Sequence, residues 1–432
     1  MSTPESSFAL LAPLEPLMDK CVHCGFCLPT CPSYLLLGKE MDSPRGRIEL
    51  MHAGVDGRVG MTDTLVGHFD TCLGCMACET ACPSGVRYAP LIEETRAAIE
   101  HHHGRSLFDS IFRGTLFRLL PFPRRLRVLA APLALVNWVR RWPRLLAALP
   151  LKVRNLIALA PAVTLSAAWR ETPARTAAVG ATRLRVGLVT GCVQRVFFGD
   201  VNEASARVLA AEGCAVAAPP GQGCCGALAL HAGRSDEARA FARGLMQAFE
   251  GTEVDQVVVN AAGCGSTMKM YGDLLKDDPV WAEKARAFAA RVRDITETLA
   301  GLGPARAARH PVPMRVAYHD ACHLAHAQGV RREPRELLQA IPGLTLVPLA
   351  DNEICCGSAG IFNLVQPEMA AELGRRKAAR IAESAADIVV TSNPGCILQI
   401  GASARAAGRD TPVIHIVQLL DASLRNAPVG RA

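Results

Sequence analysis

Aromatic residues and long hydrophobic runs are both scarce in this sequence. Phe, Trp and Tyr make up 5% of the 432 residues, although half of the residues are hydrophobic. Between residues 105 and 180, the longest stretch without a charge is 155–169, and Pro161 interrupts it. This stretch has 15 residues, whereas a membrane-spanning helix needs about 20. We therefore expect that residues 105–180 do not cross a membrane.

A secretory signal is also missing from the start of the sequence. The residues up to Lys20 include Glu5 and Glu15 and lack the basic beginning of such a signal. The chain nevertheless has 17 cysteines, and disulfides are rare in reducing compartments. Clustered cysteines in such a compartment are most often metal ligands. We therefore expect a cytoplasmic protein that binds metal through its cysteines.

Acidic residues are almost absent from residues 105–154. This segment has eleven Lys or Arg residues and one acid, Asp109, for a local charge of +10, whereas the whole chain carries +7 and the remainder therefore −3. One basic segment in an otherwise acidic chain argues against a nucleic-acid partner and for a local contact with an anionic surface. Its aromatic residues include Phe112, Phe117, Phe122, Trp138 and Trp142, and its paired cations are Arg124, Arg125, Arg140 and Arg141.

Two placements of this basic segment fit its composition. It binds peripherally to the inner face of the cytoplasmic membrane or to a partner subunit. Alternatively, it is an amphipathic helical linker that packs on the rest of the chain. We expect the linker to cover residues 105–180.

Eight cysteines in the first hundred residues form two runs with the same spacing, C-x2-C-x2-C-x3-C-P, at 21–32 and 72–83. At this spacing, one turning loop presents three thiolates to an iron–sulfur cubane, and the fourth cysteine ligates the other cluster in two-cluster ferredoxins. Zinc sites usually use paired C-x2-C knuckles instead. The runs therefore predict two [4Fe–4S] clusters, the first on Cys21, Cys24, Cys27 and Cys82 and the second on Cys72, Cys75, Cys78 and Cys31.

The stretches that follow the two runs, 45–52 and 90–100, have helical patterns. The gap between the runs is also much longer than in compact bacterial ferredoxins. These features favour a mainly helical ferredoxin-type domain over residues 1–104, as in the iron–sulfur subunits of respiratory dehydrogenases.

From residue 181 onward, short apolar strands alternate with helical stretches, which is typical of parallel βαβ units. Three segments recur at offsets of 130, 131 or 132 residues, which indicates an internal duplication. The matched segments are 185–192 with 315–322, 224–226 with 355–357, and 257–264 with 389–396. We expect two α/β domains, at 181–310 and 311–432.

Each half of the duplication contains four cysteines of the repeated pattern. They are Cys192, Cys224, Cys225 and Cys264 in the first half and Cys322, Cys355, Cys356 and Cys396 in the second. Ligation of a further iron–sulfur cluster or of zinc is one use for them, and burial as small apolar residues is the other. Cys214 has no counterpart and is expected in the core. His319 and His323 flank Cys322, and we expect ordinary hydrogen-bonded histidines there.

This cysteine pattern resembles the CCG domain of heterodisulfide reductases and related respiratory proteins. The full pattern ends in a C-x2-C pair that adds a fifth cysteine. Here those positions read Cys264-Gly-Ser-Thr267 and Cys396-Ile-Leu-Gln399, so the fifth cysteine is missing in both halves. Its loss argues against disulfide or quinone reduction at a CCG site, which stays an alternative function, as does a zinc-stabilised scaffold.

Residues 21–48, 82–88, 263–265 and 355–360 resemble the iron–sulfur subunit of bacterial glycolate oxidase. This resemblance implies an electron-transfer subunit in a hetero-oligomer, which passes electrons from a flavin subunit that oxidises glycolate or D-lactate toward the membrane quinone pool. FAD is then held by the partner subunit. Consistently, no G-x-G-x-x-G follows a predicted strand, and no catalytic residue is assigned here. Iron–sulfur subunits of glycerol-3-phosphate or lactate dehydrogenases share both modules and are alternatives.

Overall fold

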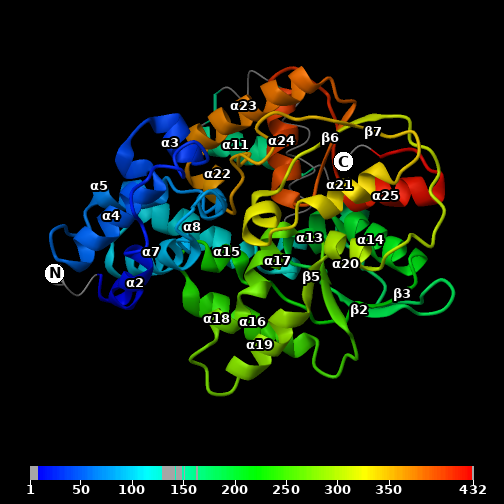
Figure 1. The fold of residues 1–432 in the computed structure, drawn as a ribbon, viewed down its shortest axis with the longest axis horizontal. Coiled ribbons are helices and arrows are strands. Elements are labelled where there is room, and N and C mark those ends of the chain that lie inside the picture. Colours follow the sequence, from blue (N-terminus) through cyan, green and yellow to red (C-terminus); the bar gives the residue numbers. More distant parts are fainter. Residues whose placement is uncertain (1–7, 129–141, 143–147, 150, 162–163, 431–432) are drawn as a thin grey trace.

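The computed structural model describes residues 8–128, 142, 148–149, 151–161 and 164–430. The helices of the N-terminal region lie at one end of the molecule, and an α/β body that contains both sheets lies at the other (Figure 1). The expected fold class is confirmed, because a mainly helical N-terminal part precedes a duplicated α/β part.

The N-terminal region contains helices and no strand within residues 8–104, all of which the structure describes. The predicted helical stretches at 45–52 and 90–100 lie within two of these helices and are confirmed. Proline stands in the first turn of α3 and of α4, where a missing N–H leaves no hydrogen bond unmade. The helices are η1 (Ala9–Leu14), α2 (Glu15–Met18), α3 (Pro32–Leu37), η2 (Glu40–Asp42), α4 (Pro44–Val55), α5 (Asp63–Asp70), α6 (Ala77–Thr80) and α7 (Tyr88–His102).

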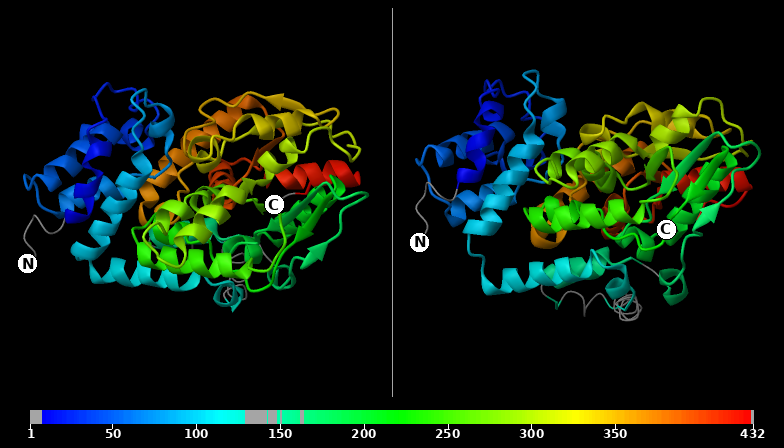
Figure 2. Two further views of the ribbon diagram at one scale, coloured as in Figure 1. Left: turned by 60° about the horizontal axis from the view of Figure 1, so that its bottom comes forward. Right: turned by 90° about the horizontal axis from the view of Figure 1, so that it is seen from below.

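The predicted linker, residues 105–180, is partly helical where the structure describes it. Its helices are α8 (Leu107–Leu119), α11 (Leu151–Leu159) and α12 (Leu165–Ala168). Helix α8 runs alongside the α/β body (Figure 2), where Leu116 and Phe117 are buried against Ile361 and Leu364. This contact supports a packed linker, whose extent over residues 105–180 stays a prediction. Trp138, Arg140 and Arg141 lie outside the described residues.

The first α/β half forms a five-stranded sheet of order β1-β3-β2-β4-β5, in which only the β1–β3 pair is antiparallel. The strands are β1 (Arg175–Thr176), β2 (Leu184–Leu188), β3 (Cys214–Ala217), β4 (Gln256–Val259) and β5 (Val292–Asp294). The helices are α13 (Val193–Phe197), α14 (Gly199–Ala211), α15 (Ala227–Leu230), α16 (Ser235–Ala248), α17 (Ala262–Lys269), α18 (Tyr271–Leu274), α19 (Ala282–Arg291) and α20 (Ile295–Gly301).

The second half forms a parallel sheet of order β7-β6-β8-β9, which repeats the order β3-β2-β4-β5 of the first. Its strands are β6 (Arg315–Tyr318), β7 (Thr345–Val347), β8 (Ile388–Thr391) and β9 (Val413–His415). Its helices are η3 (His323–Ala327), α21 (Arg332–Gln339), α22 (Phe362–Val365), α23 (Pro367–Ser384), α24 (Pro394–Ala406) and α25 (Ile416–Arg425). The matching strand order supports an internal duplication.

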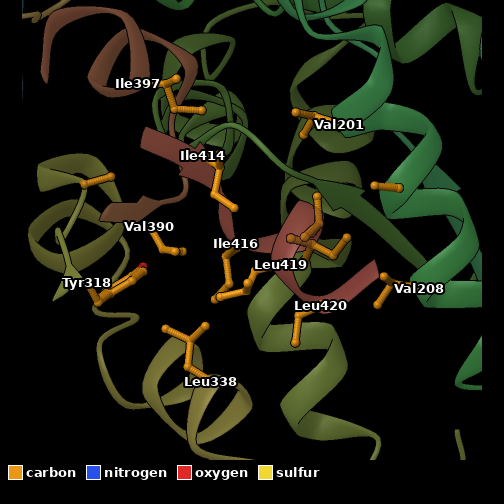
Figure 3. Close-up of a cluster of buried hydrophobic side chains, with 14 of the residues drawn as sticks. Val201, Val208, Tyr318, Leu338, Val390, Ile397, Ile414, Ile416, Leu419 and Leu420 are labelled. Carbon is orange, nitrogen blue, oxygen red and sulfur yellow. The ribbon is translucent and has the colours of Figure 1, made fainter. Parts of the chain in front are cut away.

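The two halves share one hydrophobic core. Val201 and Val208 on α14 face Leu419 and Leu420 on α25, next to Ile416 (Figure 3). All five side chains are fully buried, so removal of either helix would expose the core of both halves. Across the described residues, we find no helix with the length and apolar character needed to span a bilayer.

Candidate metal centres

The first ferredoxin site is a cavity that four cysteines line together. Cys21, Cys24, Cys27 and Cys82 lie in its wall. Burial raises the pKa of Cys21, and the thiols of Cys82 and Cys24 raise it further, so the second run contributes its last cysteine to this site. Four convergent thiols in one cavity fit the ligand set of a cubane cluster. The structure therefore brings together the four residues assigned to the first cluster.

The two cysteine loops have the same backbone conformation. His23 and Gly25 in the first loop have positive φ angles of 54° and 85°, and Gly74 and Met76 at the matching positions of the second have 62° and 61°. Positive φ is uncommon in residues other than glycine and is tolerated mainly where function demands it. A backbone that alternates between right-handed and left-handed φ angles can turn successive N–H groups toward one centre. Such a concavity suits an anionic cluster.

The second ferredoxin site is deeply buried. Burial raises the pKa of Cys78 well above its ordinary value, and the nearby thiols of Cys75, Cys72 and Cys31 add to the increase. Cys31 comes from the first run and the others from the second, so the two runs exchange their fourth cysteines. The backbone N–H of Gly74 lies 3.4 Å from Cys72 Sγ. This donor set fits a second cubane cluster in the same way.

Arg47 on α4 holds this second site together. Its side chain is fully buried and donates to Ser33 Oγ at 3.0 Å, Thr71 Oγ1 at 2.9 Å and the carbonyl of His68 at 2.6 Å. Ser33 follows Cys31 by two residues and Thr71 precedes Cys72, so one guanidinium spans the two runs. Its charge is met by Asp42, 3.8 Å away. The sequence analysis did not single out Arg47.

The pKa of the Cys72 thiol reflects this arrangement. Burial acts to raise that pKa, but the positive charges of Arg47 and Arg96 hold it below the ordinary value. Arg96 also donates to the carbonyl of Cys72 at 2.5 Å and to the carbonyl of His231 at 2.8 Å. It therefore joins the second ferredoxin site to the first α/β half.

In the first α/β half, the four cysteines of the repeat lie together near the carboxyl ends of β2 and β4. Cys192 Sγ and Cys224 Sγ are 3.6 Å apart. Contacts with Cys224 and Cys264 lower the pKa of Cys225, against the opposing effect of burial. Cys214 lies apart in β3 and is fully buried in the core, as predicted.

In the second half, Cys322 Sγ and Cys355 Sγ are 4.0 Å apart. His319, Cys356 and Cys396 form a buried group next to this pair, and their ligand atoms all lie within 4.8 Å of one another. The ring of His319 lies close enough to Cys356 to lower the pKa of that thiol, but neither of its buried ring nitrogens has a partner in hydrogen-bond geometry among the described residues. His323 contacts Cys322, with 3.5 Å between Nδ1 and Sγ.

The second ferredoxin site and the second α/β half touch directly. Cys75 is packed in one buried cluster with Cys322 and Cys355. Burial raises the pKa of Cys75, and the neighbouring Cys322 thiol raises it further. Thr80 Oγ1 and His326 Nδ1 are 3.1 Å apart along the same interface.

A second cavity lies where the ferredoxin region, α8 and both α/β halves meet. Cys72 of the second ferredoxin site forms part of its wall, opposite His231 and His323. The two imidazole rings lie 4.9 Å apart, and the Nε2 atom of each is buried without a hydrogen-bond partner. Leu228 and Phe362 supply apolar surface.

Comparisons with known proteins agree with a ferredoxin-type region followed by a duplicated α/β region. Residues 17–86 match the 4Fe–4S dicluster domain, and residues 186–269 and 316–401 each match the cysteine-rich (CCG) domain. The chain is 37% identical to the probable glycolate oxidase iron–sulfur subunit of Bacillus subtilis, over 93% of this chain and 92% of that protein. The chain belongs to the glycolate oxidase iron–sulfur subunit family.

Two further relatives illustrate the range of this family. The glycolate oxidase iron–sulfur subunit of Escherichia coli is 34% identical over 95% of both chains. Lactate utilization protein A of Oceanobacillus iheyensis is 32% identical over 55% of this chain and 97% of its own length. The dicluster and cysteine-rich domains indicate iron–sulfur clusters in this chain.

Proposed function

We propose that this chain is the electron-transfer subunit of a flavin-dependent glycolate and D-lactate dehydrogenase, with FAD on a partner subunit and quinone as the final acceptor. The names of the relatives in Bacillus subtilis and Escherichia coli support this proposal. In the same proposal, the chain comprises a ferredoxin-type domain at 1–104, a linker at 105–180 and two CCG domains at 181–310 and 311–432.

One observation carries the proposal. Eight cysteines gather into two groups of four, and each group combines three thiols of one run with the fourth of the other. We assign Cys21, Cys24, Cys27 and Cys82 to one [4Fe–4S] cluster and Cys72, Cys75, Cys78 and Cys31 to the other. When bound, such clusters supply one-electron carriers. The protein residues fix their spacing, since exchange of the fourth cysteine ties the two loops together.

The burial of the two sites sets a direction for the proposal. Cys24 is exposed at the first site, whereas Cys72 and Cys75 are buried at the second. We therefore place the flavin subunit against the first site, where Phe26 is also 64% exposed. An exposed aromatic residue beside a redox site is a suitable contact for a partner protein.

We propose that the cavity beside Cys72 receives the acceptor. Its lining is mixed: Leu228, Ile361 and Phe362 offer apolar surface to an aromatic ring, and the free Nε2 atoms of His231 and His323 suit the carbonyl oxygens of a quinone. A Leu228→Trp variant should fill the cavity and slow the reduction of a short-chain quinone at least tenfold. The substrate should still reduce the clusters of that variant. Val179→Trp, at a residue 61% exposed, is the matched control.

Peripheral binding to the inner face of the cytoplasmic membrane is the remaining part of the proposal. Leu107 and Ile111 on α8, within the basic segment, are 78% and 61% exposed. Flotation with liposomes that contain anionic lipid tests this placement. Binding that does not depend on anionic lipid or on salt would contradict it.

The decisive experiment is anaerobic co-expression with candidate flavin subunits, followed by EPR during titration with glycolate or D-lactate. We expect the substrate to reduce both clusters in the purified complex. Cys82→Ser should remove the signal of the first site, whereas Cys214→Ser, in the core, should change neither signal. If neither substrate reduces the clusters of an iron-loaded complex, the proposal fails.

Lactate as the main substrate is a second candidate, which the similarity to lactate utilization protein A favours. The same titration separates the two candidates, because only the true substrate reduces the clusters at low concentration. A glycerol-3-phosphate dehydrogenase complex would respond to neither hydroxy acid.

A further inference from the structure

His319 occupies a position that calls for a ligand. It directly follows β6, and its side chain is 1% exposed. Both ring nitrogens are buried and lack hydrogen-bond partners among the described residues. An unsatisfied buried polar group costs about 1–3 kcal/mol, and proteins rarely bear that cost without a functional reason.

Soft donor atoms surround this ring. One ring nitrogen, Cys356 Sγ and Cys396 Sγ lie within 4.8 Å of one another. Cys355 is the chain neighbour of Cys356, and Cys322 lies 4.0 Å from Cys355. Four thiols and one imidazole therefore converge in a buried site. Thiolate and imidazole together select iron, zinc or copper over magnesium and calcium.

The fifth cysteine of the full CCG pattern would stand at Gln399, and that side chain serves another purpose. Gln399 Oε1 accepts from Asn363 Nδ2 at 3.1 Å, and its Nε2 donates to the carbonyl of Ala370 at 3.0 Å. Gln399 therefore fastens α24 to α22 and α23. His319, at the end of β6, supplies a fifth donor instead.

The first half lacks this fifth donor. Val189 precedes Cys192 by three residues, as His319 precedes Cys322, and it is buried in the core of the first half. The halves differ on the opposite side as well. Lys377 on α23 is buried near Cys355 and Cys356, whereas the matching position of α16 is the apolar Leu245. A buried cation offsets the charge of a thiolate-bound centre.

We propose that the second half holds a third metal centre, an iron–sulfur centre bound by Cys322, Cys355, Cys356, Cys396 and His319, and that the first half holds none. Five donors exceed the four that a closed zinc site uses. Histidine replaces cysteine as an iron ligand in Rieske clusters, so such ligation has a precedent. Cys75 of the second ferredoxin site touches Cys322, so the centre extends the electron path. This inference deepens the proposed function but does not depend on its substrate.

The test uses the full chain, purified anaerobically, with iron and sulfide counted per chain. Two cubanes contain about eight irons. We expect clearly more iron than this per chain, with a matching amount of sulfide. The reduced protein should show coupling between the iron spins and a bound nitrogen. His319→Ala should lose that coupling and return the count to about eight. Cys264→Ser, in the first half, should change neither.

Two further variants guard against misfolding. His319→Cys should keep the additional iron and lose the nitrogen coupling, and the reduction potential of the centre should fall because a thiolate replaces an imidazole. His323→Gln is the matched control and should keep the coupling. About eight irons in the native protein, zinc in the second half, or coupling that survives in His319→Ala would overturn the inference. A count well below eight would instead contradict the proposed ferredoxin clusters.

Discussion

Replacement of Arg47 by methionine should disable the second ferredoxin site and spare the first. The guanidinium is fully buried, and its partner Asp42 is 4% exposed. Removal of one member of a buried ion pair costs about 3–5 kcal/mol. Because His68 and Thr71 still contact Asp42, at 2.9 and 2.8 Å, we expect the lower end, about 3 kcal/mol.

Iron counting and EPR measure the functional effect of this change, and urea unfolding measures the loss of stability. The EPR signal of the second site should disappear while that of the first site persists. Arg58→Met is the matched control, because its pairs with Glu49 and Asp56 are exposed to solvent, so the change should cost little stability and alter neither signal. If Arg47→Met keeps both EPR signals and lowers the free energy of unfolding by less than about 1 kcal/mol, the positioning role of Arg47 is refuted.

Three other predictions concern the rest of the fold. Burial lowers the pKa of His415 to about 4, against about 6.5 in the unfolded chain, so stability is complete above pH 6.5 and falls by about 3 kcal/mol toward pH 4. His415→Gln should lack this slope in urea unfolding. Gly233→Ala places a Cβ 2.2 Å from the carbonyl oxygen of Arg96, at a φ of +83°. It should lower stability in thermal unfolding by about 1–3 kcal/mol. Gly244→Ala is the control, because its Cβ meets open space and should not destabilise the protein. Anaerobic iron chelation should raise hydrogen exchange across residues 8–104 and leave the parallel sheets protected, because metal binding energy is folding energy there.

The cysteine runs predict their site well because the spacing itself encodes the chemistry. A loop with cysteines at every third position presents three thiolates to one centre whatever surrounds it, and the structure gathers the cysteines as that rule requires. The sequence also predicts the duplication, because junctions between a strand and a cysteine recur at nearly constant offsets. The two sheets repeat one strand order, as a duplication requires.

The surroundings of these sites could not be predicted in the same way. Arginines are almost always exposed, so nothing in the sequence marks Arg47 as buried between two runs. The contact between Cys75 and Cys322 joins residues far apart in the chain and depends on how two domains pack. The environment of His319 could not be predicted either, because a histidine beside a strand usually finds a hydrogen-bond partner, and here its neighbours are thiols.

The shared core of the two α/β halves constrains how the chain folds during synthesis. Helix α25 covers α14, and across that contact Arg207 pairs with Asp421 at 2.8 Å and Gln418 Nε2 donates to Asp200 Oδ2 at 2.6 Å. The first half therefore leaves the ribosome with its apolar face uncovered until residues 416–425 have been made. Exposed apolar surface of this kind favours aggregation, so we expect the first half to aggregate when it is expressed without the second.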